Sequence, residues 1–285
     1  MNEKITETTL SDFGGFLIGQ ERCSSTAEKY VRDVKAFLNW RSCFCREEDR
    51  LTRQQSIDWK EFLLEKGYAP VTINSMLSSV NSFFTFLGRE DCRVTLLRIQ
   101  KKVFRDKEKE LTRGEYEKLL EAARRAGKRR LCLLMECIGN TGIRVSEVRY
   151  ITVEAARAGR TDISLKGKIR TILIQKKLCR KLLEYAKNRG IQTGCIFQSK
   201  TGKELSRKQI WKDMKSLCRN AGVLPQKVFP HNLRHLFAVV FYRVSRDIVK
   251  LADVLGHSSI ETTRIYLLTT GEEHLRQMEK MCMLL

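Results

Sequence analysis

The sequence predicts a mainly α-helical protein with one small β-hairpin, built from an all-helical N-terminal domain and a mixed α+β C-terminal domain. Apolar residues recur at helical spacing through most of the chain. One short stretch, residues 161–175, instead alternates apolar and polar residues, as strands do. A charged run without apolar periodicity covers residues 99–110. We therefore place the domains at residues 1–98 and 111–285, with 99–110 as a linker.

Three helices are expected in the N-terminal domain. The first spans residues 26 to about 40 and follows a Ser-Ser-Thr run that suits helix capping. The second spans residues 52–66, and Gly67 follows it where a helix end favours a left-handed residue. The third begins after Pro70 and carries a broad apolar face as far as Leu87. Because the first of these begins only near residue 26, we expect no additional domain before it.

The C-terminal domain begins with a helix signal and a turn signal. Thr112 is followed three residues later by Glu115, the spacing of a capping box. The apolar run Leu131–Ile138 continues into a Gly-Asn-Thr-Gly cluster that is typical of turns. A helix should resume at about Ile143.

The rest of this domain is expected to hold the hairpin and five further helices. The hairpin has a basic turn, Lys166-Gly167-Lys168, between two apolar strands. Helical spacing then predicts helices over residues 177–189, 206–220, 230–244, 246–255 and 258–269.

The charge of the chain predicts a polyanionic partner such as nucleic acid. Its 54 Lys and Arg against 33 Asp and Glu give a formal net charge of +21. Residues 1–100 are neutral, with 14 basic and 14 acidic side chains, whereas residues 101–285 carry 40 and 19. The electrostatic attraction should therefore come from the C-terminal domain.

Metal sites, disulfides and membrane spans are not indicated. The ten cysteines are scattered without a C-x-x-C pair, so we expect most of them to be small buried hydrophobic residues. No P-loop and no paired-carboxylate metal motif is present. No apolar signal segment or membrane span is recognisable either. These features favour a reducing cytoplasm.

Arg144 is the first candidate for phosphate binding. It follows a glycine turn at an expected helix start, where its planar guanidinium can face a phosphate. Glu147 lies three residues later on the same helix face. For this pair alone, a surface salt bridge is the simpler interpretation.

His231 and Arg234 form a second candidate cluster in Pro230-His231-Asn232-Leu233-Arg234-His235. They lie one helical turn apart and present an imidazole and a guanidinium to the same point. Two cations there would repel each other, so a shared anion is the natural third partner. A polar helix end would explain this motif equally well.

His257 and Tyr266 form the third candidate cluster. His257 follows Gly256 in Leu-Gly-His, and Tyr266 lies nine residues later, at the end of the helix that begins there. The ordinary pKa of tyrosine, about 10, keeps a phenol protonated at neutral pH. A nucleophilic tyrosine therefore needs cationic neighbours and a base. A lone tyrosine in this apolar context is more often a core residue.

In order and spacing, these motifs together resemble the catalytic domain of the tyrosine recombinase (phage integrase) family. The matching elements are R-x-x-E, a lysine-bearing hairpin, H-x-L-R-H, L-G-H and the tyrosine, over about residues 111–270. The N-terminal helices, with Thr-Ala-Glu-Lys-Tyr from Thr26 and Thr-Ile-Asn from Thr72, resemble the family's SAM-like core DNA-binding domain. The order of the two domains resembles the two-domain architecture of the Xer recombinases within this family. The resemblance implies a site-specific DNA recombinase that cuts and rejoins strands through a 3′-phosphotyrosyl intermediate, without metal, ATP or another cofactor.

The resemblance also implies a role for each matching residue. Arg144 and Arg234 would bind the scissile phosphate, and Tyr266 would attack it. His231 and His257 would complete the pocket and help to move the tyrosine proton.

Three more residues receive roles by the same resemblance. Lys166 would protonate the leaving 5′ oxygen, with Lys168 as the nearest rival for that role. Glu147 would hold His231 in place, and His235 would lie behind the residues that touch DNA.

The implied partners are double-stranded recombination sites and further copies of the chain. Residues 272–285 carry an apolar stripe at helical spacing, formed by Leu275, Met278, Met281 and Leu285. We expect a homotetramer on DNA that exchanges these C-terminal tails, an accessory directionality protein, no membrane, and a place beside the bacterial nucleoid.

Several functions fit this resemblance. Integration or excision of a mobile element is favoured weakly over Xer-type resolution of chromosome dimers. A type IB topoisomerase-like enzyme would reseal the strand it cut, and a DNA-binding regulator would have lost catalysis. The intact set of basic residues and tyrosine argues against such a regulator.

Overall fold

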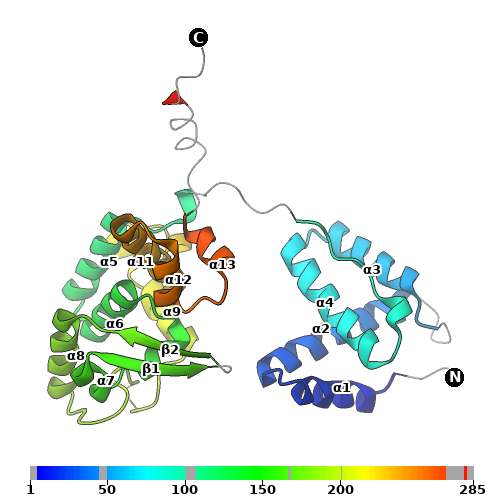
Figure 1. The fold of residues 1–285 in the computed structure, drawn as a ribbon, viewed down its shortest axis with the longest axis horizontal. Helices are drawn as coiled ribbons and strands as arrows, with labels where there is room; N and C mark the ends of the chain where they lie inside the picture. The colour runs from blue at the N-terminus through cyan, green and yellow to red at the C-terminus, as the bar shows by residue number, and fades with distance from the viewer. Residues whose placement is uncertain are drawn as a thin grey trace. The chain divides into compact units, whose positions relative to one another are not determined.

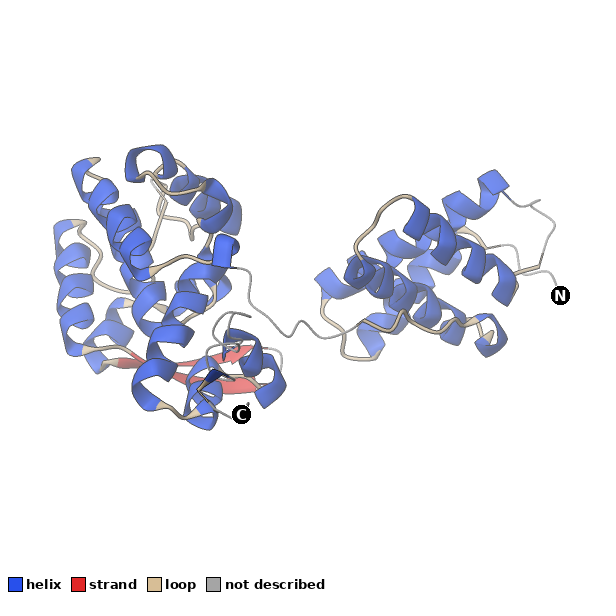
Figure 2. Cartoon of the chain, turned by 90° about the horizontal axis from the view of Figure 1, so that it is seen from above, coloured by secondary structure: helices blue, strands red, loops and turns tan. Residues whose placement is uncertain are grey.

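The computed structural model describes residues 5–44, 50–99, 107–165, 168–199, 201–267 and 279–280. The chain divides into two compact units, residues 1–101 and 102–285 (Figure 1). Helices dominate both units, and the described residues hold one two-stranded sheet (Figure 2). The predicted fold class is therefore confirmed.

The first unit is a bundle of four helices. They are α1 (Glu7–Gly19), α2 (Ser24–Phe44), α3 (Arg53–Glu65) and α4 (Pro70–Phe86), followed by the short 3-10 helix η1 (Glu90–Cys92). The three expected helices are all present. Thr52 and Gln55 form a capping box at the start of α3, and Gly67 adopts the left-handed φ of 72° expected after its end.

Helix α1 was not predicted from the sequence. It buries Leu10, Phe13 and Leu17, which follow helical spacing. Gly14 and Gly15 lie in its interior, and glycine disfavours helix by about 1 kcal/mol relative to alanine. Packing against α2 and α4 compensates for this weak intrinsic preference.

Aromatic rings form the core of the first unit. The Phe13 and Phe83 ring centroids lie 5.1 Å apart, and those of Phe37 and Trp59 lie 5.2 Å apart, both edge to face. All four side chains are buried. These contacts join α1 to α4 and α2 to α3.

The second unit contains the remaining elements. Its helices are α5 (Arg113–Arg125), α6 (Arg129–Thr141), α7 (Val153–Ala158), α8 (Lys176–Asn188), α9 (Arg207–Lys215), α10 (Cys218–Ala221), α11 (Pro230–Ser245), α12 (Ile248–Leu255) and α13 (Ile260–Arg264). Short 3-10 helices are η2 (Lys107–Lys109), η3 (Val145–Tyr150), η4 (Pro225–Lys227) and η5 (Ile265–Leu267). The strands are β1 (Arg160–Leu165) and β2 (Lys168–Leu173).

Strands β1 and β2 form the expected hairpin at one margin of the second unit (Figures 1 and 2). They pair antiparallel, with Ile163 opposite Arg170 and Thr161 opposite Ile172. Ile163 and Ile172 are buried, so one face of the hairpin packs on the core. The expected lysine tip, Lys166 with Gly167, lies outside the described residues.

Three elements of the second unit differ from the expectations. The helix expected over 206–220 is divided into α9 and α10, with Ser216 as the C-cap of α9 and its hydroxyl donating to the Asp213 carbonyl. The helix expected from Ile143 is the 3-10 helix η3, and α7 was not predicted. The first turn of α5 is as expected, since Thr112 and Glu115 form a capping box.

The cysteines behave largely as expected in the part of the chain that the structure describes. Five of them are buried: Cys92, Cys132, Cys137, Cys179 and Cys218. The described residues hold no cluster of His, Cys, Asp and Glu suited to a metal ion. Among the same residues, no helix combines the length and apolar character needed to cross a membrane.

Candidate functional site

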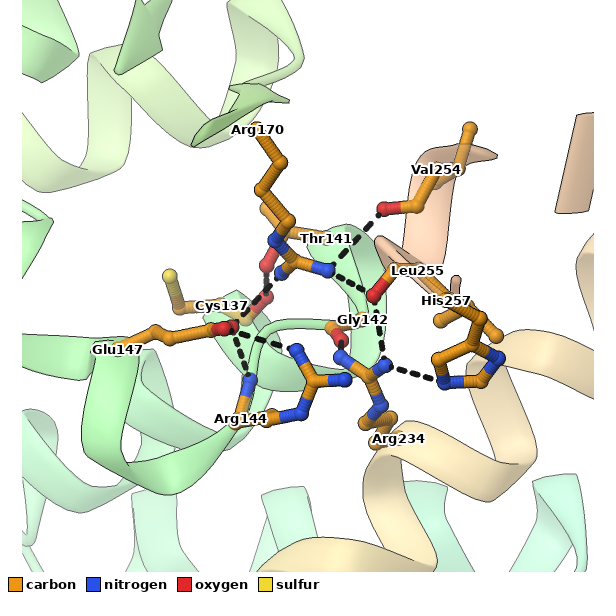
Figure 3. Close-up of polar contacts among 10 residues, drawn as sticks. All are labelled: Cys137, Thr141, Gly142, Arg144, Glu147, Arg170, Arg234, Val254, Leu255 and His257. Atoms are coloured by element: carbon orange, nitrogen blue, oxygen red, sulfur yellow. Dashed lines mark hydrogen bonds and ion pairs between the residues drawn. The ribbon is translucent and has the colours of Figure 1, made fainter. Parts of the chain in front are cut away.

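Arg234 lies at the centre of the candidate site, where its charge is buried. Its side chain projects from the first turns of α11 and is 1% exposed. The guanidinium donates to the Gly142 carbonyl at 2.5 Å, the Leu255 carbonyl at 2.8 Å and the His257 Nε2 at 2.9 Å (Figure 3). No carboxylate pairs with it among the described residues. Burying a charge without a counter-ion is costly, so this site favours an anion.

The Gly142 turn at the end of α6 makes room for this arrangement. Gly142 has a left-handed φ of 64°. A Cβ atom there would lie 2.4 Å from a ring carbon of Phe237. Both observations require glycine at the position whose carbonyl receives Arg234.

The pKa of Arg234 reflects this environment. Burial and, to a lesser extent, the nearby Arg144 lower its pKa to about 10, although the Tyr266 phenol acts in the opposite direction. The guanidinium therefore stays charged at neutral pH.

Arg144 lies directly before η3 and is the more exposed of the two candidate phosphate-binding arginines. Its side chain is 42% exposed, and its Nη1 donates to the Glu147 Oε1 at 3.0 Å. The Arg144 backbone N–H donates to the Glu147 Oε2 at 2.7 Å. Glu147 thus fixes both the backbone and the guanidinium of Arg144.

Glu147 is buried and contacts a second arginine, Arg170. Its Oε2 accepts from the Arg170 Nη2 at 2.7 Å. Among the described residues no hydrogen bond joins Glu147 to His231, so the expectation that Glu147 holds this histidine in place stays a prediction. The carboxylate is occupied by the two guanidinium groups and one backbone N–H.

Arg170 is a site residue that was not predicted. Ile172 and Ile174, two and four residues further along the chain, are buried. Because every second residue of a strand shares a face, Arg170 points toward the same interior. A charged residue on the inward face of an apolar strand was the signal available in the sequence.

His257 is held as a neutral imidazole in one tautomer. A guanidinium can only donate, so the contact with Arg234 requires an unprotonated Nε2 on His257. Its Nδ1 then carries the hydrogen and donates to the Thr263 Oγ1 at 2.8 Å. Burial and, to a lesser extent, the charge of Arg234 lower the pKa of His257 to about 4.

Tyr266 lies in η5 and is 6% exposed. Its ring centroid lies 5.7 Å from that of His257, with the two rings nearly parallel, and 6.2 Å from that of His231. The His235 ring centroid is 5.1 Å away. Together with the hydrogen bond to Arg234, these contacts bring the phenol into the cluster of basic residues.

His231 and His235 lie one turn apart on the same face of α11. Partial burial, Arg234 and Arg144 lower the pKa of His231 from its ordinary value. The His235 Nε2 lies 3.6 Å from the Glu110 Oε1. Asn232, between them, donates from Nδ2 to the Lys109 and Lys227 carbonyls.

An open cleft of about 1470 Å³ borders this cluster. Arg144, Arg170 and His257 are among the residues that line it. Lys166 lies outside the described residues, so its expected role remains a prediction. The remaining expected site residues lie together in the second unit: Arg144, Glu147, His231, Arg234, His235, His257 and Tyr266.

This arrangement defines the class of protein. Fixed guanidinium donors stabilise a phosphoryl group as it gains charge, neutral imidazoles can accept a proton, and a phenol can act as nucleophile. The second unit therefore brings together the groups that a phosphoryl transfer to a tyrosine would use.

Comparison with known proteins identifies the family. Residues 109–272 match the phage integrase family, and residues 10–91 match the phage integrase N-terminal SAM-like domain. The chain belongs to the phage integrase family, whose tyrosine recombinases cleave and rejoin DNA in site-specific recombination.

Individual relatives agree with this assignment. The tyrosine recombinase XerA of Pyrococcus furiosus is 29% identical over 97% of this chain and 95% of its own length. The crystal structure of the XerH site-specific recombinase bound to palindromic difH substrate, a post-cleavage complex, is similar with a TM-score of 0.69, at 18% identity over 98% of this chain and 90% of that one. The Tn1549 transposon integrase in complex with transposon right end DNA gives a TM-score of 0.68, at 15% identity over 96% and 99%.

Proposed function

We propose that Tyr266 is the nucleophile of this recombinase and that Arg144, Arg234, His231 and His257 form its phosphate pocket. The supporting observation is the contact of the Tyr266 phenol with Arg234 inside a cluster of three imidazole rings. A phenol used only for packing would need no such surroundings. The chemistry proposed here uses neither a metal nor ATP.

In the first step, the Tyr266 oxygen attacks the scissile phosphorus and loses its proton. The bond between phosphorus and the 5′ oxygen breaks, leaving a 3′-phosphotyrosyl link and a free 5′ hydroxyl. In the second step, a 5′ hydroxyl of the partner strand attacks this link and releases the phenol. Arg144 and Arg234 stabilise the charge on the non-bridging oxygens in both steps.

His231 is the best-placed acceptor for the phenol proton. Both nitrogens of His257 are engaged, one by Arg234 and one by Thr263. His231 makes no hydrogen bond among the described residues, and its lowered pKa keeps it neutral at pH 7. His257 would then orient Arg234 and stack on the Tyr266 ring. His235, whose Nε2 lies near the Glu110 carboxylate, would pack against the same ring.

Lys166 is proposed as the donor that protonates the leaving 5′ oxygen, with Lys168 as the alternative. A substrate with sulfur in place of that oxygen needs no such proton, because a thiolate is a better leaving group. Cleavage by Lys166→Ala should therefore recover on the sulfur substrate, while Lys168→Ala should cleave both substrates like the wild type. The reverse pattern would assign the role to Lys168.

The recombination partner is proposed to be double-stranded DNA held by a homotetramer that exchanges C-terminal tails, with an accessory directionality protein. Residues 268–278 and 281–285 lie outside the described residues, so the support comes from the apolar stripe of the sequence. Deletion of residues 272–285 should abolish synapsis of two sites while single-site binding persists. Unchanged recombination by the truncated chain would contradict tail exchange.

Two biological roles have specific support. Similarity to the transposon integrase supports movement of a mobile element, which we propose as the main role. The nearly full-length match to XerA supports the alternative, a Xer-type role in resolving chromosome dimers. Sequencing the DNA that the protein captures covalently in its host distinguishes them. Strands from element ends support the first role, and a single chromosomal site independent of any element supports the second.

A covalent-capture experiment tests the proposed function and provides its substrate. The full chain is incubated with a randomised library of nicked duplexes, and protein-linked strands are recovered and sequenced. The wild type should enrich one sequence, and Tyr266→Phe should enrich none. A type IB topoisomerase-like enzyme would reseal the cut strand without transferring it to a partner, and an inert regulator would form no adduct.

A further inference from the structure

Arg170 connects the two proposed phosphate-binding arginines without being one of them. It projects from β2, and its side chain is 10% exposed. Two of its nitrogens reach two different elements: Nη2 contacts Glu147 in η3, and Nη1 contacts backbone carbonyls at the end of α12 (Figure 3). These partners are the same ones that hold Arg144 and Arg234.

On one side, the link runs through Glu147. The Glu147 carboxylate accepts from Arg170 at 2.7 Å and from the Arg144 guanidinium at 3.0 Å. Moving Arg170 would therefore release one side of the carboxylate that fixes Arg144.

On the other side, the link runs through the Leu255 carbonyl. This oxygen accepts from the Arg170 Nη1 and, at 2.8 Å, from the Arg234 Nη2. The Val254 carbonyl accepts from the same Arg170 nitrogen at 3.4 Å. Arg170 therefore holds the end of α12 at the point where Arg234 also binds it.

The Gly256 turn is shaped around Arg170. Gly256 has a left-handed φ of 63°, and a Cβ atom there would lie 2.3 Å from the Arg170 Cδ. The close approach lets Arg170 reach the Leu255 carbonyl directly before the turn that presents His257. Backbone and side chain are thus fitted to each other.

Only an arginine can make this connection. Its two terminal nitrogens serve η3 and α12 at once, whereas a lysine has one nitrogen to offer. The buried Arg170 Nε has no hydrogen-bond partner in the part of the chain that the structure describes. The guanidinium is therefore held by its two terminal nitrogens. Losing the Nη2 contact would release Glu147, and losing the Nη1 contact would release the Leu255 carbonyl.

We propose that Arg170 is a positioning residue that fixes the separation and orientation of Arg144 and Arg234 by tying Glu147 to the Leu255 carbonyl, without touching DNA itself. The inference rests on the proposed function, because it assumes that these two arginines bind the scissile phosphate. Misplacing catalytic groups by about 1 Å can reduce a rate on the order of a hundredfold. Arg170 thereby controls cleavage more than DNA affinity.

The test measures single-turnover adduct formation by full-length Arg170→Lys on the captured nicked duplex. The rate should fall by about tenfold or more, while the Kd for the same DNA stays within about twofold of the wild type. A methylphosphonate at the scissile position removes the negative charge that the arginines recognise. Arg170→Lys should therefore slow phosphodiester cleavage much more than methylphosphonate cleavage, whereas general loss of structure would slow both equally.

Arg130→Lys is the matched control. Arg130 also joins a backbone carbonyl, that of Gln198 at 2.7 Å, to a carboxylate, that of Asp213 at 3.3 Å. These partners lie outside the proposed phosphate pocket. The control should therefore cleave both substrates at wild-type rates.

A second pair of variants covers the case in which Arg170→Lys does not fold. Gly256→Ala leaves Arg170 in place but pushes on its Cδ, and it should reproduce the selective loss of phosphodiester cleavage. Gly159→Ala introduces comparable backbone strain, at φ 70°, with only an ordinary contact to the Ile174 carbonyl at 3.8 Å. It should cleave like the wild type.

The outcomes separate this inference from the proposed function. Wild-type adduct formation that is lost in Tyr266→Phe supports the proposed function. With that result in hand, equal slowing on both substrates, or wild-type rates in Arg170→Lys and Gly256→Ala, overturns the positioning role alone. Absence of any wild-type adduct overturns both.

Discussion

The two units bury polar groups in different ways. In the first unit, the buried Asp33 pairs at 2.7 Å with Lys29, four residues earlier on the same helix. In the second unit, the buried Arg234 is bonded to residues 92 and 21 positions away, and Arg170 to residues 23 and 85 positions away. The buried acid of the first unit therefore has its counter-ion on the same helix, whereas the two buried guanidinium groups of the second unit are bonded to distant parts of the chain.

Net charge follows the same division. Residues 1–100 are neutral, whereas residues 101–285 carry the whole surplus of +21. All four histidines of the sequence also lie in the second unit. The comparison teaches that both units have an apolar core, but that only the second adds a cluster of buried cationic side chains to it, and the following changes should separate the two.

The largest effect is expected from Phe83→Ala, which removes a fully buried ring of the first unit. Such truncations cost about 3–5 kcal/mol, so this unit should lose much of its stability. Chemical denaturation followed by tryptophan fluorescence would measure the loss, because two of the three tryptophans, Trp40 and Trp59, are buried in this unit. A variant as stable as the wild type would contradict the assigned core.

The next effect concerns the site of the second unit. Arg144→Ala should slow adduct formation by on the order of a hundredfold or more, because it removes one fixed donor to the transition state. Its half-exposed side chain suggests little change in folding stability. Arg234→Ala should lose cleavage too, but should also destabilise the unit because its guanidinium is buried. Equal stability of the two variants would contradict this difference between the arginines.

A matched pair of capping variants tests the two units with the same chemistry. Thr52 caps α3 in the first unit, and Thr112 caps α5 in the second, each within a capping box. Replacing either by alanine should cost about 1 kcal/mol. Hydrogen exchange should show that each loss is confined to the unit that carries the substitution. Exchange that rises in both units for either variant would contradict their separate cores.

A further effect is a pH dependence that arises from a histidine of the second unit. Folding lowers the pKa of His257 from 6.5 to about 4, so between these values the unfolded chain binds a proton that the folded chain does not. Stability is therefore fully present above about pH 6.5 and falls as the pH drops toward about 4. His257→Gln should show a weaker fall than the wild type in denaturant titrations. An identical pH dependence would contradict the buried neutral imidazole.

Local patterns predicted most of the fold. Helical spacing located α2, α3 and α4, and the change to alternation located the hairpin, because these features depend on neighbouring residues. Helix α1 was missed because its two interior glycines, Gly14 and Gly15, give it a weak helix propensity. Tertiary packing of its apolar face stabilises it. The helical spacing of residues 206–220 continues across the break between α9 and α10, so it did not reveal that break.

The site was predictable only in part. The order of the motifs predicted that Arg144, Arg234 and Tyr266 share one site, because the family they resemble combines these motifs in one catalytic domain. The partners of Glu147 could not be derived in this way, because its contact with Arg170 depends on strand register and on space beside Gly256. The strand pattern could have indicated that Arg170 faces inward, but it could not have indicated that Glu147 is its partner.

The most direct test of the proposed site compares wild type with Tyr266→Phe in covalent capture on the enriched nicked duplex. The wild type should form a protein–DNA adduct that resists denaturation and releases a peptide containing phosphorylated Tyr266 after proteolysis. Tyr266→Phe should bind the same DNA and form no adduct. An adduct that persists in Tyr266→Phe, or that maps to another residue, would contradict the proposed site.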